Sequence, residues 1–321
     1  TLRNRPLLFG LAATFLISLI ASRNRFGSIS GGALPVSPGG AMDLISKYIE
    51  SWHIVGMGSG EYSPPWIVIL AIASLLTFGK VWLFITIFFL FMPSLAFFVM
   101  YRSARRFGLS IQVAVIGGLI YGLSPVIWNS INQGRLGTLV IALLAPILLS
   151  LMPRTLDFES LSWRRTYSLS LLASLLSAFS SLFLAIWTIT FIALFSGALV
   201  NRRAEIKGTG IVKFLMRAEL ARIRRFFAFM LIPALLTLPW SASLLFHPTQ
   251  ILLEPGLALS GGSFLQVLLL NPGGISGIPV WIVAPFILFL VALIVSKRFP
   301  AQVSAAIILL ALAALLSQIQ I

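Results

Sequence analysis

The chain contains no cysteine, two histidines and eight acidic residues among its 321. The missing cysteine excludes disulfides, cysteine-ligated zinc and thiol chemistry. The sequence has no Walker motif and no Asp-x-Asp pair. The spaced glycines Gly56, Gly58 and Gly60 lack the strand, helix and acid of a dinucleotide site. The chain therefore holds no nucleotide or metal motif, and its cofactor stays unknown.

Charge of either sign is also scarce, at 10% of residues, whereas 59% are hydrophobic and the mean hydropathy is +1.02. A soluble chain averages about 25% charged residues, so this composition predicts an all-α, polytopic transmembrane bundle. The net charge of +15 is then explained by basic cytoplasmic loops and not by nucleic acid.

Apolar runs long enough for a bilayer core predict about nine spans and one shorter helix. The 34-residue run 167–200 is too long for one crossing, so we divide it near Ser180 and Ser181. We interpret the short run 66–79 as a juxtamembrane or re-entrant helix. The predicted spans are 6–22, 81–101, 110–127, 138–152, 167–180, 182–200, 226–246, 280–296 and 301–319.

The distribution of basic residues predicts the orientation in a plasma membrane. With the N-terminus of this chain cytoplasmic, 18 of the 23 lysines and arginines face inward. Residues 1–321 then form a single integral membrane domain with a first outer loop at 23–80, a basic cytoplasmic segment at 201–225 and a second outer loop at 247–279. Because the chain starts at Thr1 and ends inside an apolar run, we expect it to be a piece of a longer protein.

The first outer loop carries most of the candidate chemistry. The spacing of Ile45, Ile49 and Trp52 predicts an amphipathic helix near 42–53 lying in the membrane interface. The loop also holds Asp43 and Glu50, and a carboxylate there could act as a general base toward a hydroxyl acceptor. The simpler alternatives are an i,i+4 pair of Asp43 with Lys47 and a solvated Glu50.

Other outward polar residues extend this set. Glu61 and Glu254 are the remaining outer carboxylates, and His53 is a candidate substrate-binding residue or a histidine satisfied at the interface. Lys80 and Arg135 are outer cations beside apolar spans, suited to a lipid phosphate. Snorkelling to the headgroups explains these two cations equally well. Arg135 has the more suggestive setting, WNSINQGRLG.

The basic cytoplasmic segment 201–225 admits two interpretations. It anchors the chain to anionic lipid headgroups, as such segments commonly do, or it is a docking surface for a cytoplasmic catalytic domain. The predicted spans contain no charged residue in their interiors, which argues against an ion-coupled transporter.

The order of features resembles the polytopic glycosyltransferases of the GT-C superfamily. A first span at 6–22 is followed by an outer loop bearing an acid, by Pro64-Pro65-Trp66 and by a span ending in a basic turn, RSARRFG. The stretches WHIVGMGSGEYSPPW, YRSARRFGLS and YGLSPVIWNSINQGRLG are similar to the membrane part of actinobacterial-type proteins, in which a family-2 glycosyltransferase domain precedes a GT-C-like membrane domain.

This resemblance implies sugar transfer from a polyprenyl-phosphate donor to a glycan acceptor in the cell envelope. Asp43 or Glu50 would take the place of the catalytic acid, and Lys80 or Arg135 would bind the phosphate. The partners implied are membrane lipid, the lipid-linked sugar, the acceptor and a cytoplasmic family-2 glycosyltransferase domain. The alternative is a non-enzymatic anchor, flippase or transporter module serving an attached catalytic domain.

Overall fold

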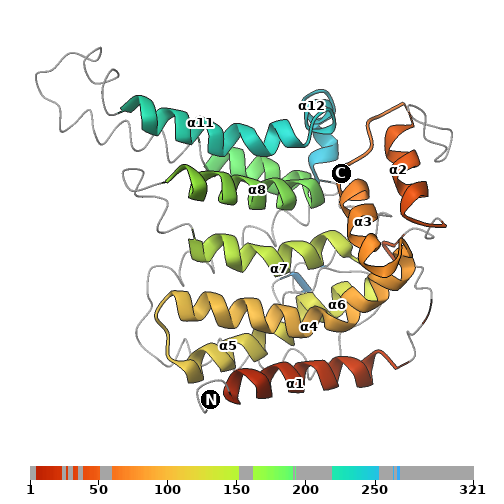
Figure 1. The fold of residues 1–321 in the computed structure, drawn as a ribbon, viewed down its shortest axis with the longest axis vertical. Helices are drawn as coiled ribbons and strands as arrows, with labels where there is room; N and C mark the ends of the chain where they lie inside the picture. The colour runs from red at the N-terminus through yellow and green to blue at the C-terminus, as the bar shows by residue number, and fades with distance from the viewer. Residues whose placement is uncertain are drawn as a thin grey trace, which may run out of the picture. The chain divides into compact units, whose positions relative to one another are not determined.

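A computed structural model describes residues 5–23, 27, 32–34, 39–50, 60–151, 162–190, 192, 219–252, 263 and 266–267. Within these residues the chain is helical and has no strand (Figure 1). The helices are α1 (Arg5–Ala21), α2 (Ala41–Ile49), α3 (Trp66–Ser74), η2 (Leu75–Thr77), α4 (Val81–Arg106), α5 (Ile111–Gly122), α6 (Pro125–Gln133), α7 (Leu136–Leu151), α8 (Trp163–Phe179), α11 (Glu219–Leu236), α12 (Trp240–Phe246) and η4 (Pro248–Leu252).

Within the described residues, α1, α4, α5, α7, α8 and α11 overlap predicted spans, whereas α6 lies largely beyond the predicted span 110–127. The predicted break is present: α8 ends at Phe179, Ser180 is extended with φ −155°, and a new helix covers Ser181–Thr190. The predicted spans 280–296 and 301–319 lie outside the described residues.

Two helices in the described part are long and apolar enough to cross a membrane, Val81–Arg106 and the α5–α6 segment Ile111–Gln133. A third crossing results if α11 and α12, bent by 92°, form one broken span. The segment Trp66–Thr77 is shorter, and so are Arg5–Ala21, Leu136–Leu151 and Ser181–Thr190, which lie in runs that we predicted as spans.

The chain divides into two compact units. Unit 1 contains Thr1–Asp43, Leu70–Ile147 and Pro255–Ile321, and unit 2 contains Leu44–Ile69 and Leu148–Glu254.

At the centre of unit 1, the phenyl ring of Phe97 packs against glycines of neighbouring helices. Phe97 of α4 is fully buried, and a Cβ added at Gly10 of α1 would lie 2.1 Å from its ring. A Cβ at Gly118 of α5 would lie 2.8 Å from the same ring, and one at Gly122 would lie 2.6 Å from the carbonyl oxygen of Pro93. Small residues let membrane helices approach closely, so this glycine pocket fixes how α1, α4 and α5 pack.

The arginines of α1 and α4 lie at one end of unit 1. Leu7 of α1 packs against Tyr101 and Ala104 of α4, so Arg5 shares an end with the arginines that close α4. Lys80 lies at the opposite end, immediately before α4 begins. The Ser103 hydroxyl donates to the Pro146 carbonyl (3.0 Å); the second half of α7 therefore lies beside the end of α4, and α7 begins at the Lys80 end.

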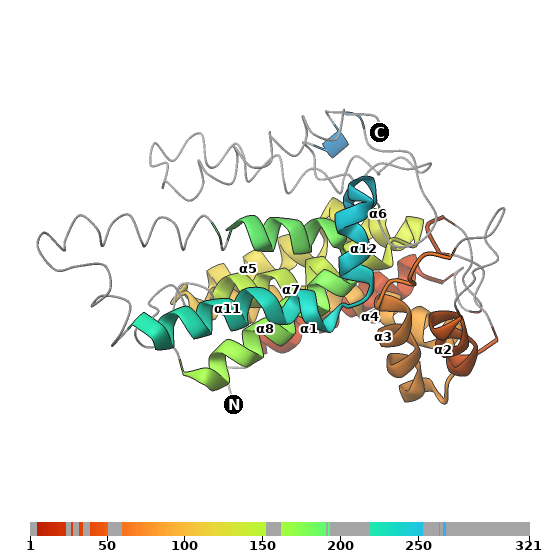
Figure 2. The ribbon, with the colours of Figure 1, turned by 90° about the horizontal axis from the view of Figure 1, so that it is seen from above.

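In unit 2, α8 and α11 lie side by side (Figures 1 and 2). Thr166, Ser170, Ser174 and Ser177 form a buried stripe of small residues on α8, of the kind that lets membrane helices approach closely. At the bend after α11, the Thr237 hydroxyl donates to the Pro233 carbonyl (2.8 Å) and the Ser241 hydroxyl to the Ala234 carbonyl (2.7 Å). These bonds satisfy carbonyls that the broken helix leaves without backbone donors.

Candidate functional site

The candidate site is built on α6 and the turn that joins it to α7. Pro125 occupies the first turn of α6, where its missing N–H costs nothing, and Gly134 ends the helix in the left-handed conformation (φ 68°). The Gln133 amide donates to Asn129 Oδ1 (2.9 Å), and Arg135 Nε donates to Gln133 Oε1 (2.9 Å). The turn therefore holds the guanidinium in a fixed place through a chain of side-chain hydrogen bonds.

Arg135 is 7% exposed, and Asn129 and Gln133 are also buried. A snorkelling arginine keeps its charged head in water, so this degree of burial disagrees with the snorkelling alternative. Burying a guanidinium is costly unless polar partners surround it. The motif WNSINQGRLG therefore produces a buried arginine whose guanidinium is fixed by hydrogen bonds.

Two further polar groups of α6 are buried and make no hydrogen bond, the indole N–H of Trp128 and the hydroxyl of Ser130. Buried polar groups are nearly always paired, so each such exception suggests a missing ligand or a strained position. Trp128 and Ser130 are two positions apart on α6 and therefore lie on different faces of the helix, so the anion-binding chemistry of this region rests on the held guanidinium of Arg135.

A short segment of the loop 23–80 packs against this turn. The Ala33 N–H donates to the Gln133 carbonyl (2.7 Å), and Gly32 adopts φ +61° directly against the same group. A Cβ at Gly32 would lie 2.2 Å from the Gln133 oxygen, so only glycine fits. The loop is thereby fastened to the residue that holds Arg135.

Lys80 lies on a second fastened turn at the same end of unit 1. The Lys80 N–H donates to the Thr77 carbonyl (3.0 Å), and the Thr77 hydroxyl donates to the Lys80 carbonyl (2.9 Å). The neighbouring Gly79 carbonyl accepts from the N–H of Ala41, the first residue of α2 (3.0 Å). The backbone is fixed on both sides, while the Lys80 side chain is exposed.

Asp43 follows on the first turn of α2, where its carboxylate accepts from the Gly40 N–H (3.1 Å). This is the bond that the N3 side chain of a capping box makes to the N-cap N–H, so Asp43 also stabilises the start of α2, a role that the general-base hypothesis did not include. The side chain is otherwise exposed. The structure brings Asp43, Lys80 and Arg135 to one end of unit 1, and it shows no ion pair made by Asp43 or Lys80 in the described part.

The other predicted site residues belong elsewhere. Glu50 is exposed just after α2, in unit 2. Glu61 accepts from the Gln250 amide (2.6 Å), and the Ser181 hydroxyl donates to the Gln250 carbonyl (3.1 Å), so Glu61 ties the loop to η4. His53 and Glu254 lie outside the described residues.

The predicted amphipathic helix is present as α2 over Ala41–Ile49, with residues 51–59 outside the description. Ile49 is exposed and Ile45 is half-buried, whereas Trp52 lies in the undescribed stretch. The described residues include no group of three or more side chains that could hold a metal ion.

Sequence reasoning identified the polar surroundings of Arg135 but missed Ser130 and the docking of Gly32. The available signal was the Gly31-Gly32-Ala33 triplet, because paired glycines often mark a close backbone approach. Comparisons with protein-family models, with curated proteins and with solved structures found no match.

Proposed function

We propose that the chain is a membrane glycosyltransferase, or the membrane module of one, that uses a polyprenyl-phosphate sugar in cell-envelope glycan synthesis. The observation that carries this proposal is the buried guanidinium of Arg135, which Gln133 holds in place. Phosphate is the anion that suits such a group, because arginine binds it through a bidentate fork.

The proposal places the chain in the plasma membrane with about nine spans and the N-terminus of this chain in the cytoplasm. The end of unit 1 that carries Asp43, Lys80 and Arg135 then faces outward. This is supported by the separation of the arginines at the end of α4 from this site within unit 1. The donor lipid would lie in the bilayer with its phosphate at the site.

In this reaction an acceptor hydroxyl attacks the anomeric carbon of the sugar. The new glycosidic C–O bond forms as the bond to the phosphate oxygen breaks, and the polyprenyl phosphate leaves. Asp43 or Glu50 would take the proton of the hydroxyl, while Arg135 and Lys80 would stabilise the charge on the leaving phosphate.

Sugar transfer in membranes that carry Asp43→Asn, Glu50→Gln or Arg135→Lys at matched expression tests the proposal. Asparagine still accepts a hydrogen bond from the Gly40 N–H, so Asp43→Asn keeps the α2 cap and removes only the base. Losing a positioned general base costs about 10²–10⁴ in rate. If all three variants transfer at the wild-type rate, the chemistry lies outside this chain.

A specific observation favours a second candidate, a non-enzymatic anchor, flippase or transporter module for an attached catalytic domain. The 92° bend between α11 and α12 resembles the discontinuous helices that line transporter binding sites. The two functions separate in proteoliposomes: a flippase moves the lipid-linked sugar across the bilayer without forming a glycosidic bond.

A further inference from the structure

The starts of α8 and α11 in unit 2 form a patch of arginines and aromatic rings. The two helices pack against each other, and none of the four arginines makes an ion pair in the part of the chain that the structure describes. We call this the arginine–aromatic patch; its members are Trp163, Arg164, Arg165, Tyr167, Arg224 and Arg225.

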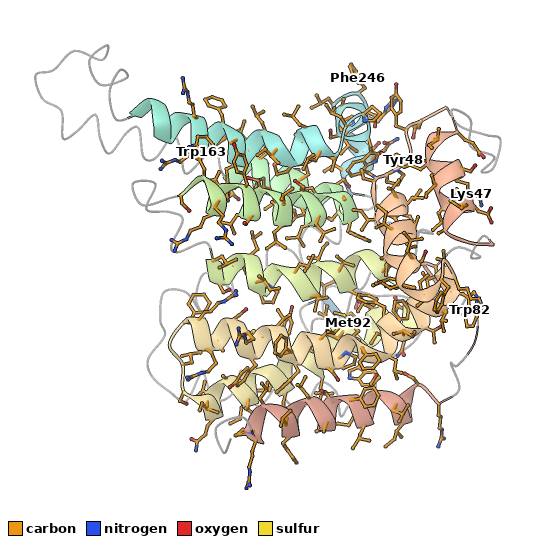
Figure 3. The ribbon with its side chains drawn as sticks, in the orientation of Figure 1. Lys47, Tyr48, Trp82, Met92, Trp163 and Phe246 are labelled. Atoms are coloured by element: carbon orange, nitrogen blue, oxygen red, sulfur yellow. The ribbon has the colours of Figure 1, made fainter. Side chains whose placement is uncertain are left out.

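The rings organise the patch. The guanidinium of Arg225 on α11 lies 5.8 Å from the centre of the Trp163 ring on α8, within the range of a cation–π interaction. Trp163 stacks on Tyr167 with 5.5 Å between ring centres, and both are partly exposed (Trp163 is labelled in Figure 3). The Arg225 Nε is buried and makes no hydrogen bond.

The residues that follow the patch place it at the surface of a bilayer. Leu171 on α8 and Phe227 and Leu231 on α11 are apolar and substantially exposed, as expected of lipid-facing helices. Tryptophan and tyrosine prefer the level of the headgroups. In a bilayer the arginines would then lie at the level of the lipid phosphates.

Positive charge gathers at the start of α8 and favours binding of an anion. The first turn of α8 contains no acidic residue and carries Arg164 and Arg165. A helix start already has a partial positive charge, so two arginines there raise a potential that a bound anion lowers.

We propose that the arginine–aromatic patch binds the phosphate of an anionic phospholipid headgroup, with the lipid tails along the exposed apolar faces of α8 and α11. Charge complementarity and the level of the patch both point to a lipid. The inference requires only that this chain lies in a membrane, so it stands or falls independently of glycosyl transfer.

The test is native mass spectrometry of the purified full chain titrated with phosphatidylglycerol or with phosphatidylcholine of the same acyl chains. The wild type should bind phosphatidylglycerol more tightly than phosphatidylcholine. A basic residue near the surface contributes about 1 kcal/mol to such binding. Arg164→Gln with Arg224→Gln, two exposed positions, should therefore weaken phosphatidylglycerol binding about 25-fold and leave phosphatidylcholine binding unchanged.

The matched control removes two exposed cations elsewhere, Arg23→Gln with Lys47→Gln, and should keep the preference for phosphatidylglycerol. Equal binding of both lipids by the wild type would overturn the proposal, as would equal losses in the two double variants. Competition by inorganic phosphate as effective as phosphatidylglycerol would also overturn it, because the patch would then bind free anions.

Discussion

Replacing Gly32 by alanine should release the first outer loop from the turn that holds Arg135. The added Cβ would lie 2.2 Å from the Gln133 carbonyl oxygen and 2.7 Å from its carbon. Both atoms belong to the backbone, so no side-chain rotation relieves the collision. The segment must therefore move away and lose the hydrogen bond from the Ala33 N–H (2.7 Å).

Two terms set the magnitude. An alanine in the left-handed region costs about 1–2 kcal/mol, and the lost hydrogen bond contributes about 0.5–1.5 kcal/mol. If the segment detaches, the backbone strain is relieved and the penalty is limited to what the contact had contributed. We expect the segment to detach, with a loss of about 0.5–1.5 kcal/mol in local stability and faster amide exchange at residues 32–34.

Hydrogen exchange in nanodiscs measures this directly, with Gly108→Ala as the control. Gly108 also has a positive φ (+81°), but a Cβ there meets nothing within 4 Å, so this variant adds strain without a collision. Exchange at 32–34 should rise in Gly32→Ala alone. Equal exchange in both variants would refute the docking of this segment against Gln133.

Three further predictions concern packing, the site and orientation. Gly118→Ala should lower the thermal stability in detergent because its Cβ would press on a buried ring, whereas at the neighbouring Gly117 a Cβ meets nothing within 4 Å and alanine should be tolerated. Gln133→Leu should weaken binding of the sugar donor, because it removes the acceptor that orients the Arg135 guanidinium. The variant should show a higher KM for the donor and an unchanged melting temperature; an unchanged KM would contradict this role. Single cysteines in this cysteine-free chain should react with an impermeant reagent in intact cells at Ser59 and not at Thr209, and the opposite pattern would invert the orientation.

The sequence was sufficient to locate a helix where the length of an apolar run and the charged residues beside it both limit the span. The apolar run before Arg102 predicted the span within α4, although the helix itself continues to Arg106. The serine pair at 180 and 181 predicted the break after α8, because lipid crossing limits helix length. The bend between α11 and α12 was not predicted within the run 226–246, although Pro239 and the hydroxyls of Thr237 and Ser241 marked it.

The site was predictable only in its local part. Asn129, Gln133 and Arg135 are close in sequence, so their clustering could be inferred from the motif. The contact of Gly32 with Gln133 joins segments about 100 residues apart, which local pattern cannot reveal. Asp43 was interpreted as a base, although an acid in the first turn of a helix is equally a capping signal.

Binding of polyprenyl phosphate to the purified chain tests the central claim most directly. Arg135→Lys keeps the charge but loses the bidentate fork, and one charge-assisted hydrogen bond contributes about 1.5–3 kcal/mol. We predict that Arg135→Lys raises the Kd about 10- to 150-fold, while Arg23→Lys leaves it unchanged. Wild-type affinity in Arg135→Lys would contradict the assignment of this buried arginine as the phosphate-binding group.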